Sequence, residues 1–270
     1  MEINELKRIA NNNRKRIVEM VYSAKVGHVG GALSAIDLVT AICEMDIDYN
    51  SKERSRLVLS KGHACPAIYA ELVQKGVLKE EDLLTFRHIN SRLQGHPYTV
   101  DIPEVDATTG LLGQGFSMAV GMALVKKQCD KDHRVYAIAG DGEMDEGQMW
   151  EAIMMAAHNK LDNLVLIVDY NKLSSTHPTN EVINLESLTA KMEAFNLHTI
   201  EIDGNDMEQV VKALEEAKTV KGKPTAIIAN TVKGKGVSFM ENVGKWHSSG
   251  LTDDEYRIAM DDLKRIEETL

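Results

Sequence analysis

The chain has 270 residues, of which 43% are hydrophobic and 27% charged, close to the balance of ordinary globular proteins. Its formal net charge of −10 argues against nucleic acid or an anionic membrane as the main partner, so an anionic cofactor would need local devices to hold it. Three widely spaced cysteines without a Cys-x-x-Cys pair indicate reduced thiols, and no run approaches the roughly eighteen apolar residues of a membrane span; we therefore expect a cytoplasmic protein.

The N-terminal part predicts helices joined by glycine-rich turns. Residues 3–24 carry apolar side chains at helical spacing, and this segment has no apolar signal core. A turn is expected at the glycines of residues 27–31, after which Ser34 should cap a helix over residues 35–45. Residues 61–64 predict a turn into a further helix.

Apolar strands alternate with helices in the rest of the chain. Strands are expected at 57–60, 135–139, 164–168, 198–202 and 225–229, and helices at 146–159, 206–217 and 253–270. The strands lack polar alternation, which predicts a doubly wound, mainly parallel sheet with helices on both faces. Four methionines in and just before the 146–159 helix are expected in its core. No repeat or linker interrupts the pattern, so residues 1–270 are expected to form a single α/β domain.

Polar residues follow the ends of two successive predicted strands. Gly140-Asp141-Gly142 ends the first strand, and Asn171 follows the second, thirty positions after the aspartate. One βαβ unit is about thirty residues, so both side chains should meet at the sheet edge where doubly wound folds bind ligands. With a backbone carbonyl such as that of Leu173, they form a hard-oxygen set suited to Mg²⁺ or Ca²⁺ and two phosphate oxygens. Gly-Asp-Gly alone is also ordinary turn chemistry; the spacing to Asn171 favours the metal site.

These residues belong to motifs known from one enzyme family. GDGEMDEG at 140–147 followed by VDYNK at 168–172 resembles the thiamine diphosphate motif of transketolases. Four further segments resemble the same family in the same order: GHVGGALS at 27–34, LSKGHA at 59–64, QGHPYTVDIPEVDATTGLLGQGFSMAVGMA at 94–123 and KWHSSG at 245–250. LSKGHA favours transketolases over the related deoxyxylulose-phosphate synthases. The resemblance covers nearly the whole chain and implies the thiamine-diphosphate-binding fold, in its diphosphate-binding form.

The resemblance also implies roles for particular residues. Asp141, Asn171 and the Leu173 carbonyl would ligate the divalent metal. Contacts with thiamine diphosphate are implied for His63, Gly110, Leu112, Gly140, Asp141, Gly142, Glu143, Asn171 and His247. Leu111 departs from the proline that is usual in the family, which would loosen the turn slightly. Glu146 resembles the glutamate that reaches across the dimer to the cofactor-activating glutamate of the other subunit.

Four histidines, His28, His63, His96 and His247, stand in motifs rich in glycine or serine. A histidine beside glycine is often only a turn residue, so the residues alone leave their role open. The resemblance implies that His28 and His63 contact sugar substrates, that His96 lies beside the thiazolium, and that His247 meets both diphosphate and substrate. Imidazole suits these catalytic roles because it can stabilise a developing alkoxide and move protons near neutral pH.

Full-length transketolases are more than twice as long as this sequence. Their second α/β domain binds the aminopyrimidine, supplies the activating glutamate and grips the sugar phosphate. The present sequence is therefore either a natural subunit or an expressed fragment, and the start at Met1 favours the subunit. We expect a separate C-terminal partner chain, in an α₂β₂ assembly with cofactors at the interfaces.

The expected function is that of the N-terminal subunit of a split transketolase. This transferase would move a two-carbon ketol unit from a ketose phosphate to an aldose phosphate, in carbohydrate metabolism such as the pentose phosphate pathway, and only with its partner. One alternative is a related thiamine-diphosphate enzyme with the same half-site, including one acting on a sulfonated or branched sugar. Another is a non-catalytic paralogue, against which the intact Asp141/Asn171 pair and the four histidines argue. No GxGxxG opens a predicted βα turn, which disfavours a dinucleotide-binding fold.

Overall fold

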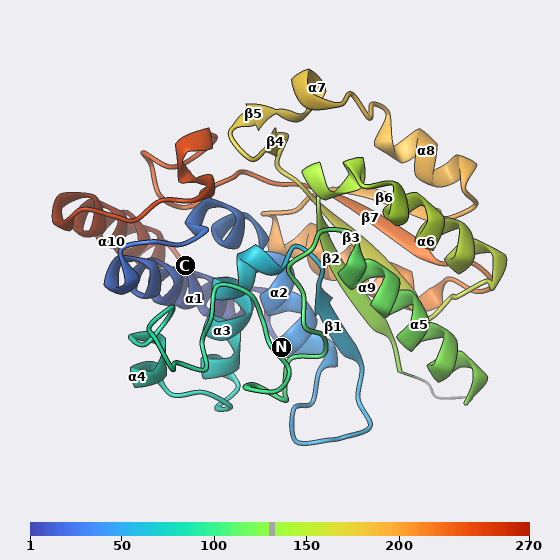
Figure 1. The fold of residues 1–270 in the computed structure, drawn as a ribbon, viewed down its shortest axis with the longest axis horizontal. Coiled ribbons are helices and arrows are strands. Elements are labelled where there is room, and N and C mark those ends of the chain that lie inside the picture. The colour runs from blue at the N-terminus through green and yellow to red at the C-terminus, as the bar shows by residue number, and fades with distance from the viewer. Residues whose placement is uncertain (130–132) are drawn as a thin grey trace.

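A five-stranded parallel sheet forms the centre of the computed structural model, which describes residues 1–129 and 133–270 (Figure 1). Its strands are β1 (Arg56–Leu59), β2 (Val135–Gly140), β3 (Leu164–Tyr170), β6 (His198–Asp203) and β7 (Thr225–Asn230). They lie in the order β1-β2-β3-β7-β6, and each neighbouring pair is parallel. The predicted α/β fold with a parallel sheet is confirmed.

Helices cover both faces of this sheet (Figure 1). On one face lie α1 (Ile3–Ala24), α2 (Val29–Asp46), α3 (Cys65–Gln74) and α9 (Met207–Thr219), with α10 (Asp253–Glu267) packed on α1; on the other lie α5 (Gln114–Gln128), α6 (Gly147–His158) and α8 (Leu188–Ala194). Successive strand residues alternate between the two cores: Ile138 joins the first and Ala137 the second. Burial on both faces explains the lack of polar alternation. No helix in the described residues is both long and apolar enough to cross a membrane.

Shorter elements gather where the strands end. They comprise β4 (Leu173–Ser174), β5 (His177–Pro178), α7 (Thr179–Val182) and the 3₁₀ turns η1 (Gly62–Ala64), η2 (Gly142–Asp145) and η3 (Gly244–His247), whereas the short helix α4 (Glu80–Leu83) packs beside α1 and α3. β4 and β5 pair as an antiparallel hairpin directly after β3. With α7 they lie beyond the end of β3 at the top of Figure 1. This edge carries the candidate site.

The structure corrects the start of the second helix. α2 begins at Val29, so Ser34 lies inside the helix and does not cap it. Gly30 serves close packing, because a Cβ there would lie 2.7 Å from the carbonyl oxygen of Trp246. Ser34 itself is buried and donates a hydrogen bond to Asp169, 2.5 Å away. Tertiary contacts therefore override the turn signal of the local sequence.

Candidate active site

A cavity of about 380 Å³ opens at the carboxyl edge of the sheet, beyond β1, β2, β3 and β7. Among the sequence-predicted site residues, those that line it are His28, His63, His96, Gly110, Leu112, Gly140, Asp141, Gly142, Glu143, Asn171, Leu173 and His247. Glu146 is the predicted site residue that the cavity lining does not include. The cavity is also lined by Gly31, Lys61, Ser174, Ser175 and Lys233, which the sequence analysis missed. Motifs far apart in the chain thus converge on one site.

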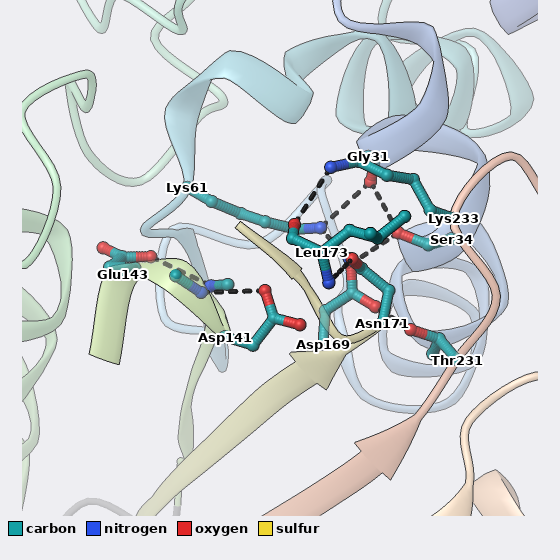
Figure 2. Close-up of polar contacts among 12 residues, drawn as sticks. Gly31, Ser34, Lys61, Asp141, Glu143, Asp169, Asn171, Leu173, Thr231 and Lys233 are labelled. Atoms are coloured by element: carbon teal, nitrogen blue, oxygen red, sulfur yellow. Dashed lines mark hydrogen bonds and ion pairs between the residues drawn. The ribbon is translucent and has the colours of Figure 1, made fainter. Parts of the chain in front are cut away.

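Asp141 and Asn171 come together at the ends of β2 and β3 (Figure 2). The Asp141 carboxylate accepts hydrogen bonds from the backbone N–H of Gly142 at 2.8 Å and of Lys172 at 2.5 Å. Asn171 Oδ1 accepts one from the N–H of Leu173 at 3.2 Å. The aspartate therefore contacts the turn that carries the asparagine, as expected for two neighbouring parallel strands.

A buried ion pair lies beneath this turn (Figure 2). Asp169 is fully buried, pairs with the ammonium of Lys61 and accepts hydrogen bonds from the hydroxyls of Ser34 and Thr231. The Asn171 Nδ2 also donates to Asp169, at 3.4 Å. Because Nδ2 of Asn171 points toward the Asp169 carboxylate, Oδ1 of the same amide points away from that carboxylate. The ion pair thus orients a predicted ligand.

The oxygen set at this edge fits a hard divalent cation completed by phosphate oxygens. Among the residues described, no cluster of three or more His, Cys, Asp or Glu side chains could hold a metal by itself. Asp141, Asn171 and the Leu173 carbonyl offer oxygen ligands with one negative charge, so an ion here would need further anionic oxygens. Burial, helped by the nearby charge of Asp169, raises the pKa of Asp141 to about 6. A bound cation would offset that cost of burial.

Lys233 brings a positive charge to the same oxygen set (Figure 2). Its buried ammonium donates hydrogen bonds to the carbonyl oxygens of Leu173 at 3.0 Å and Ser175 at 2.7 Å. Burial lowers the pKa of Lys233 to about 8, against the opposing charge of Asp141. The side chain therefore remains largely protonated at neutral pH. An anion entering the cavity would meet this ammonium beside the oxygen set.

Three imidazoles form a triangle on the wall of the cavity. The ring centroids are 5.0 Å apart for His28 and His63, 5.2 Å for His28 and His247, and 5.3 Å for His63 and His247. His96 lies against the 110–113 turn, where a Cβ on Gly110 would be 3.4 Å from its Cδ2. Burial lowers the pKa of all four, to about 4 for His28 and His247, with neighbouring cations adding to the effect. Near neutral pH each ring is therefore neutral, with one donor and one acceptor nitrogen.

We expect His28 and His247 to titrate with midpoints near pH 4 in the chain without cofactor, followed by NMR of their ring signals. Because these pKa values lie below the value of about 6.5 for an unfolded histidine, the unfolded chain binds more protons between the two values. Stability from these groups is therefore complete above about pH 6.5 and is lost as the pH falls toward 4. Midpoints near 6.5 for both rings would contradict their burial in the triangle.

The two predicted glutamates occupy different places. Glu143 is buried and accepts hydrogen bonds from the Ser60 hydroxyl at 2.5 Å, the Gly113 N–H at 2.7 Å and the Gly140 N–H at 3.1 Å. It therefore ties together three segments of the cavity wall: the end of β1, the 110–113 turn and the end of β2. Glu146, by contrast, is exposed at the N-cap of α6. A role for Glu146 toward a cofactor would require a second chain.

Known proteins resemble this chain along nearly its full length. The family model described as "Transketolase, thiamine diphosphate binding domain" matches residues 5–264. One of the subunits of the apulose-4-phosphate transketolase of Phocaeicola vulgatus is 39% identical over 274 residues, which cover 99% of this chain and 97% of the relative. The 6-deoxy-6-sulfo-D-fructose transketolase subunit SqwG of a Clostridium species is 42% identical, with 97% of each chain covered.

A solved structure gives the same fold. The transketolase of Campylobacter jejuni superposes with a TM-score of 0.91 at 33% identity, over 98% of this chain. The match covers 43% of the chain of that structure. The present chain therefore spans less than half of this solved transketolase, whereas it matches almost all of the two relatives named as subunits.

Proposed function

The chain belongs to the transketolase family, and we propose that it is the diphosphate- and metal-binding subunit of a split transketolase. With a separate C-terminal, pyrimidine-binding subunit it transfers a two-carbon ketol unit from a ketose phosphate to an aldose phosphate. The observation that carries this proposal is the shared cavity that joins the Asp141–Asn171 oxygens to the triangle of imidazoles. We also propose that residues 1–270 form one domain, which the family match over residues 5–264 supports.

The proposed cofactors are thiamine diphosphate and Mg²⁺, with Ca²⁺ as the alternative ion. When bound, thiamine diphosphate supplies the electron sink for breaking the bond next to a ketose carbonyl. In this chain Asp141, Asn171 and the Leu173 carbonyl hold the metal, as their chemistry supports. The Gly142 N–H and the Lys233 ammonium face the diphosphate. The 110–112 turn contacts the rest of the coenzyme.

The neutral histidines carry the chemistry on the sugar. His28 and His63 donate hydrogen bonds to sugar oxygens on which negative charge develops, and exchange protons with sugar hydroxyls. His96 lies beside the reacting end of the coenzyme, and His247 contacts both diphosphate and substrate. Neutral rings suit these roles because each can donate from one nitrogen while accepting at the other. Their burial supports this reading, since it lowers the pKa of each ring.

An exposed apolar face on α5 and α6 supports an assembly. We define the α5–α6 face by Met118, Val125, Met154 and Met155, whose side chains are all exposed. The methionines of this region are expected in the core from the sequence; that is correct for the buried Met144 and Met149 and wrong for Met154 and Met155. Apolar side chains gathered on one surface mark an interaction site more often than chance.

We propose that the α5–α6 face contacts a second copy of this chain in an α₂β₂ assembly with two C-terminal subunits. Glu146 is the N-cap of α6 and its side chain is exposed, so it lies at the end of one of the two helices that form this face. From there it can reach the coenzyme site of the other half, as in the family. This arrangement is supported by the position of Glu146, which does not line the cavity of its own chain and can therefore face another chain.

A sulfonated or branched sugar is the second candidate substrate class. Two relatives that cover nearly the whole chain are named for apulose 4-phosphate and for 6-deoxy-6-sulfo-D-fructose. The imidazoles and other polar groups of the cavity suit a ketose with several hydroxyl groups, and many ketoses meet this description. The substrate is therefore decided by comparing ketose donors in one assay.

We expect ketol transfer only when this chain is mixed with a C-terminal transketolase subunit from the same source, in the presence of thiamine diphosphate and Mg²⁺. Each chain alone should be inactive, and the active species should elute with the mass of two copies of each chain. Activity of this polypeptide by itself would refute the split enzyme. Cofactor binding by the mixture without turnover of any sugar would instead indicate a non-catalytic paralogue.

A further inference from the structure

Arg87 lies near His96, just outside the residues that line the cavity, and its guanidinium is free. It lies after α4, in the loop that leads to His96, and its side chain is exposed. Within the described residues it makes no side-chain hydrogen bond or ion pair. The guanidinium rests against Gly95, where a Cβ would lie 3.1 Å from both Cζ and Nη1. The charged group is therefore placed next to the residue that precedes His96.

The backbone holds Arg87 in an unfavourable conformation. Its φ of 61° lies in the left-handed region, which residues other than glycine adopt at a cost. Its N–H donates a hydrogen bond of 2.7 Å to the carbonyl oxygen of Leu93, which closes the loop. Such conformations persist where the surrounding structure determines them, and they gather at ligand sites. The loop thus fixes the backbone from which the Arg87 side chain extends toward Gly95.

The charge of Arg87 acts on one end of the cavity. It lowers the pKa of His28 and of His96, second to the effect of burial, whereas the charges that act on the pKa of Asp141 are those of Asp169 and Lys61. Lys61 is buried in its pair with Asp169, and Lys233 is bonded to backbone carbonyls. In a chain with a net charge of −10, Arg87 is therefore a cation with free donors next to the segment that carries His96.

Resting on the proposed function, the geometry points to Arg87 as the residue of this chain that binds the terminal oxyanion, phosphate or sulfonate, of the sugar substrate. His96 lines the cavity and directly follows Gly95, against which the guanidinium packs, so the charged end of a sugar that leaves the cavity past His96 would meet Arg87. A planar guanidinium presents paired N–H donors that match the oxygens of either group. Recognition of the charged end is then shared between this chain and the C-terminal subunit.

The kinetic test compares three donors on one carbon skeleton: D-fructose 6-phosphate, 6-deoxy-6-sulfo-D-fructose and D-fructose. In the reconstituted enzyme, Arg87→Gln should lower the ratio of kcat/KM for a charged donor to that for D-fructose by about 10- to 100-fold. Arg92→Gln is the matched control, because Arg92 is exposed in the same loop and is not among the charges that act on His28 or His96. It should keep the wild-type ratio.

The outcomes separate the two oxyanions. A fall in the ratio for one charged donor alone assigns the site to phosphate or to sulfonate, and a fall for both supports a general oxyanion site. An unchanged ratio in Arg87→Gln overturns the proposal, and so does an equal loss for all three donors, which would indicate a structural role. Absence of transfer by the wild-type enzyme with every donor would count against the proposed function instead.

Anion binding by the chain itself tests Arg87 without turnover. Inorganic phosphate and methanesulfonate are titrated into the isolated chain while the ring signals of His28 and His96 are followed by NMR. Saturable shifts are expected for the wild type and for Arg92→Gln, and their loss is expected for Arg87→Gln. Shifts that persist in Arg87→Gln, or their absence from the wild type, would refute the assignment.

Discussion

Replacing Asp141 with asparagine is expected to lower the affinity of the assembled enzyme for thiamine diphosphate in Mg²⁺ by more than about 100-fold, because it removes the charged metal ligand. Ketol transfer should fall at least as far. The fold itself should not lose stability. Burial raises the pKa of this carboxyl to about 6, so the charged group is costly in the chain without metal. The amide oxygen of an asparagine can still accept the Gly142 N–H hydrogen bond.

Titration calorimetry measures the affinity for thiamine diphosphate, and thermal unfolding of the chain without metal measures the stability of the fold. Asp145→Asn is the matched control, since Asp145 ends the 3₁₀ turn that Asp141 caps but does not line the cavity. It should bind the coenzyme like the wild type. Wild-type affinity and turnover in Asp141→Asn would remove the basis for a metal site here.

Lys61→Met is expected to destabilise the fold by about 3–5 kcal/mol, because it leaves a buried carboxylate without its counter-ion. No other cation compensates for the lost ammonium, since Asp169 is fully buried and its other hydrogen-bond donors are neutral hydroxyls and an amide. The change should also weaken coenzyme binding, because the buried pair that orients the Asn171 amide would be broken. Urea unfolding of the chain measures the free energy of unfolding directly.

Two further variants isolate the cause of this loss. The double variant Lys61→Met/Asp169→Asn should recover a large part of the stability, because it removes the unpaired charge as well. Lys25→Met breaks the exposed ion pair with Asp253 and should leave the free energy of unfolding close to that of the wild type. Equal losses for Lys61→Met and Lys25→Met would show that the buried pair adds nothing.

The sheet was predictable because its strands are buried on both faces. The runs that form β2 and β3 are apolar without alternation, and they end in Gly140-Asp141-Gly142 and Asn171, so the strands and the site edge follow from local pattern. Helix α5 was not predicted. One side of it packs Phe116 and Ala123 in the core, while the other exposes Val125, so no polar face marks its period.

The site residues that belong to motifs with glycine and histidine were predictable from the sequence. The cationic residues of the site were not, because the folded chain brings them there. Lys61 and Lys233 each stand next to glycine just beyond a buried strand, and that position is the signal that could have found them. Arg87 has no such signal, because its place depends on the path of the loop after α4. The start of α2 was missed for a similar reason: contact with Trp246, and not a turn, requires Gly30.

The central claim is that two strand ends hold one cation, which in turn holds the diphosphate. A crystal structure of the assembled enzyme grown with thiamine diphosphate and Mn²⁺ in place of Mg²⁺ tests it, because anomalous scattering locates the ion. We predict a single peak in the cavity bonded to the Asp141 carboxylate, Asn171 Oδ1, the Leu173 carbonyl oxygen and two diphosphate oxygens. A coenzyme bound with no ion between Asp141 and Asn171, or an ion held elsewhere, would contradict the account.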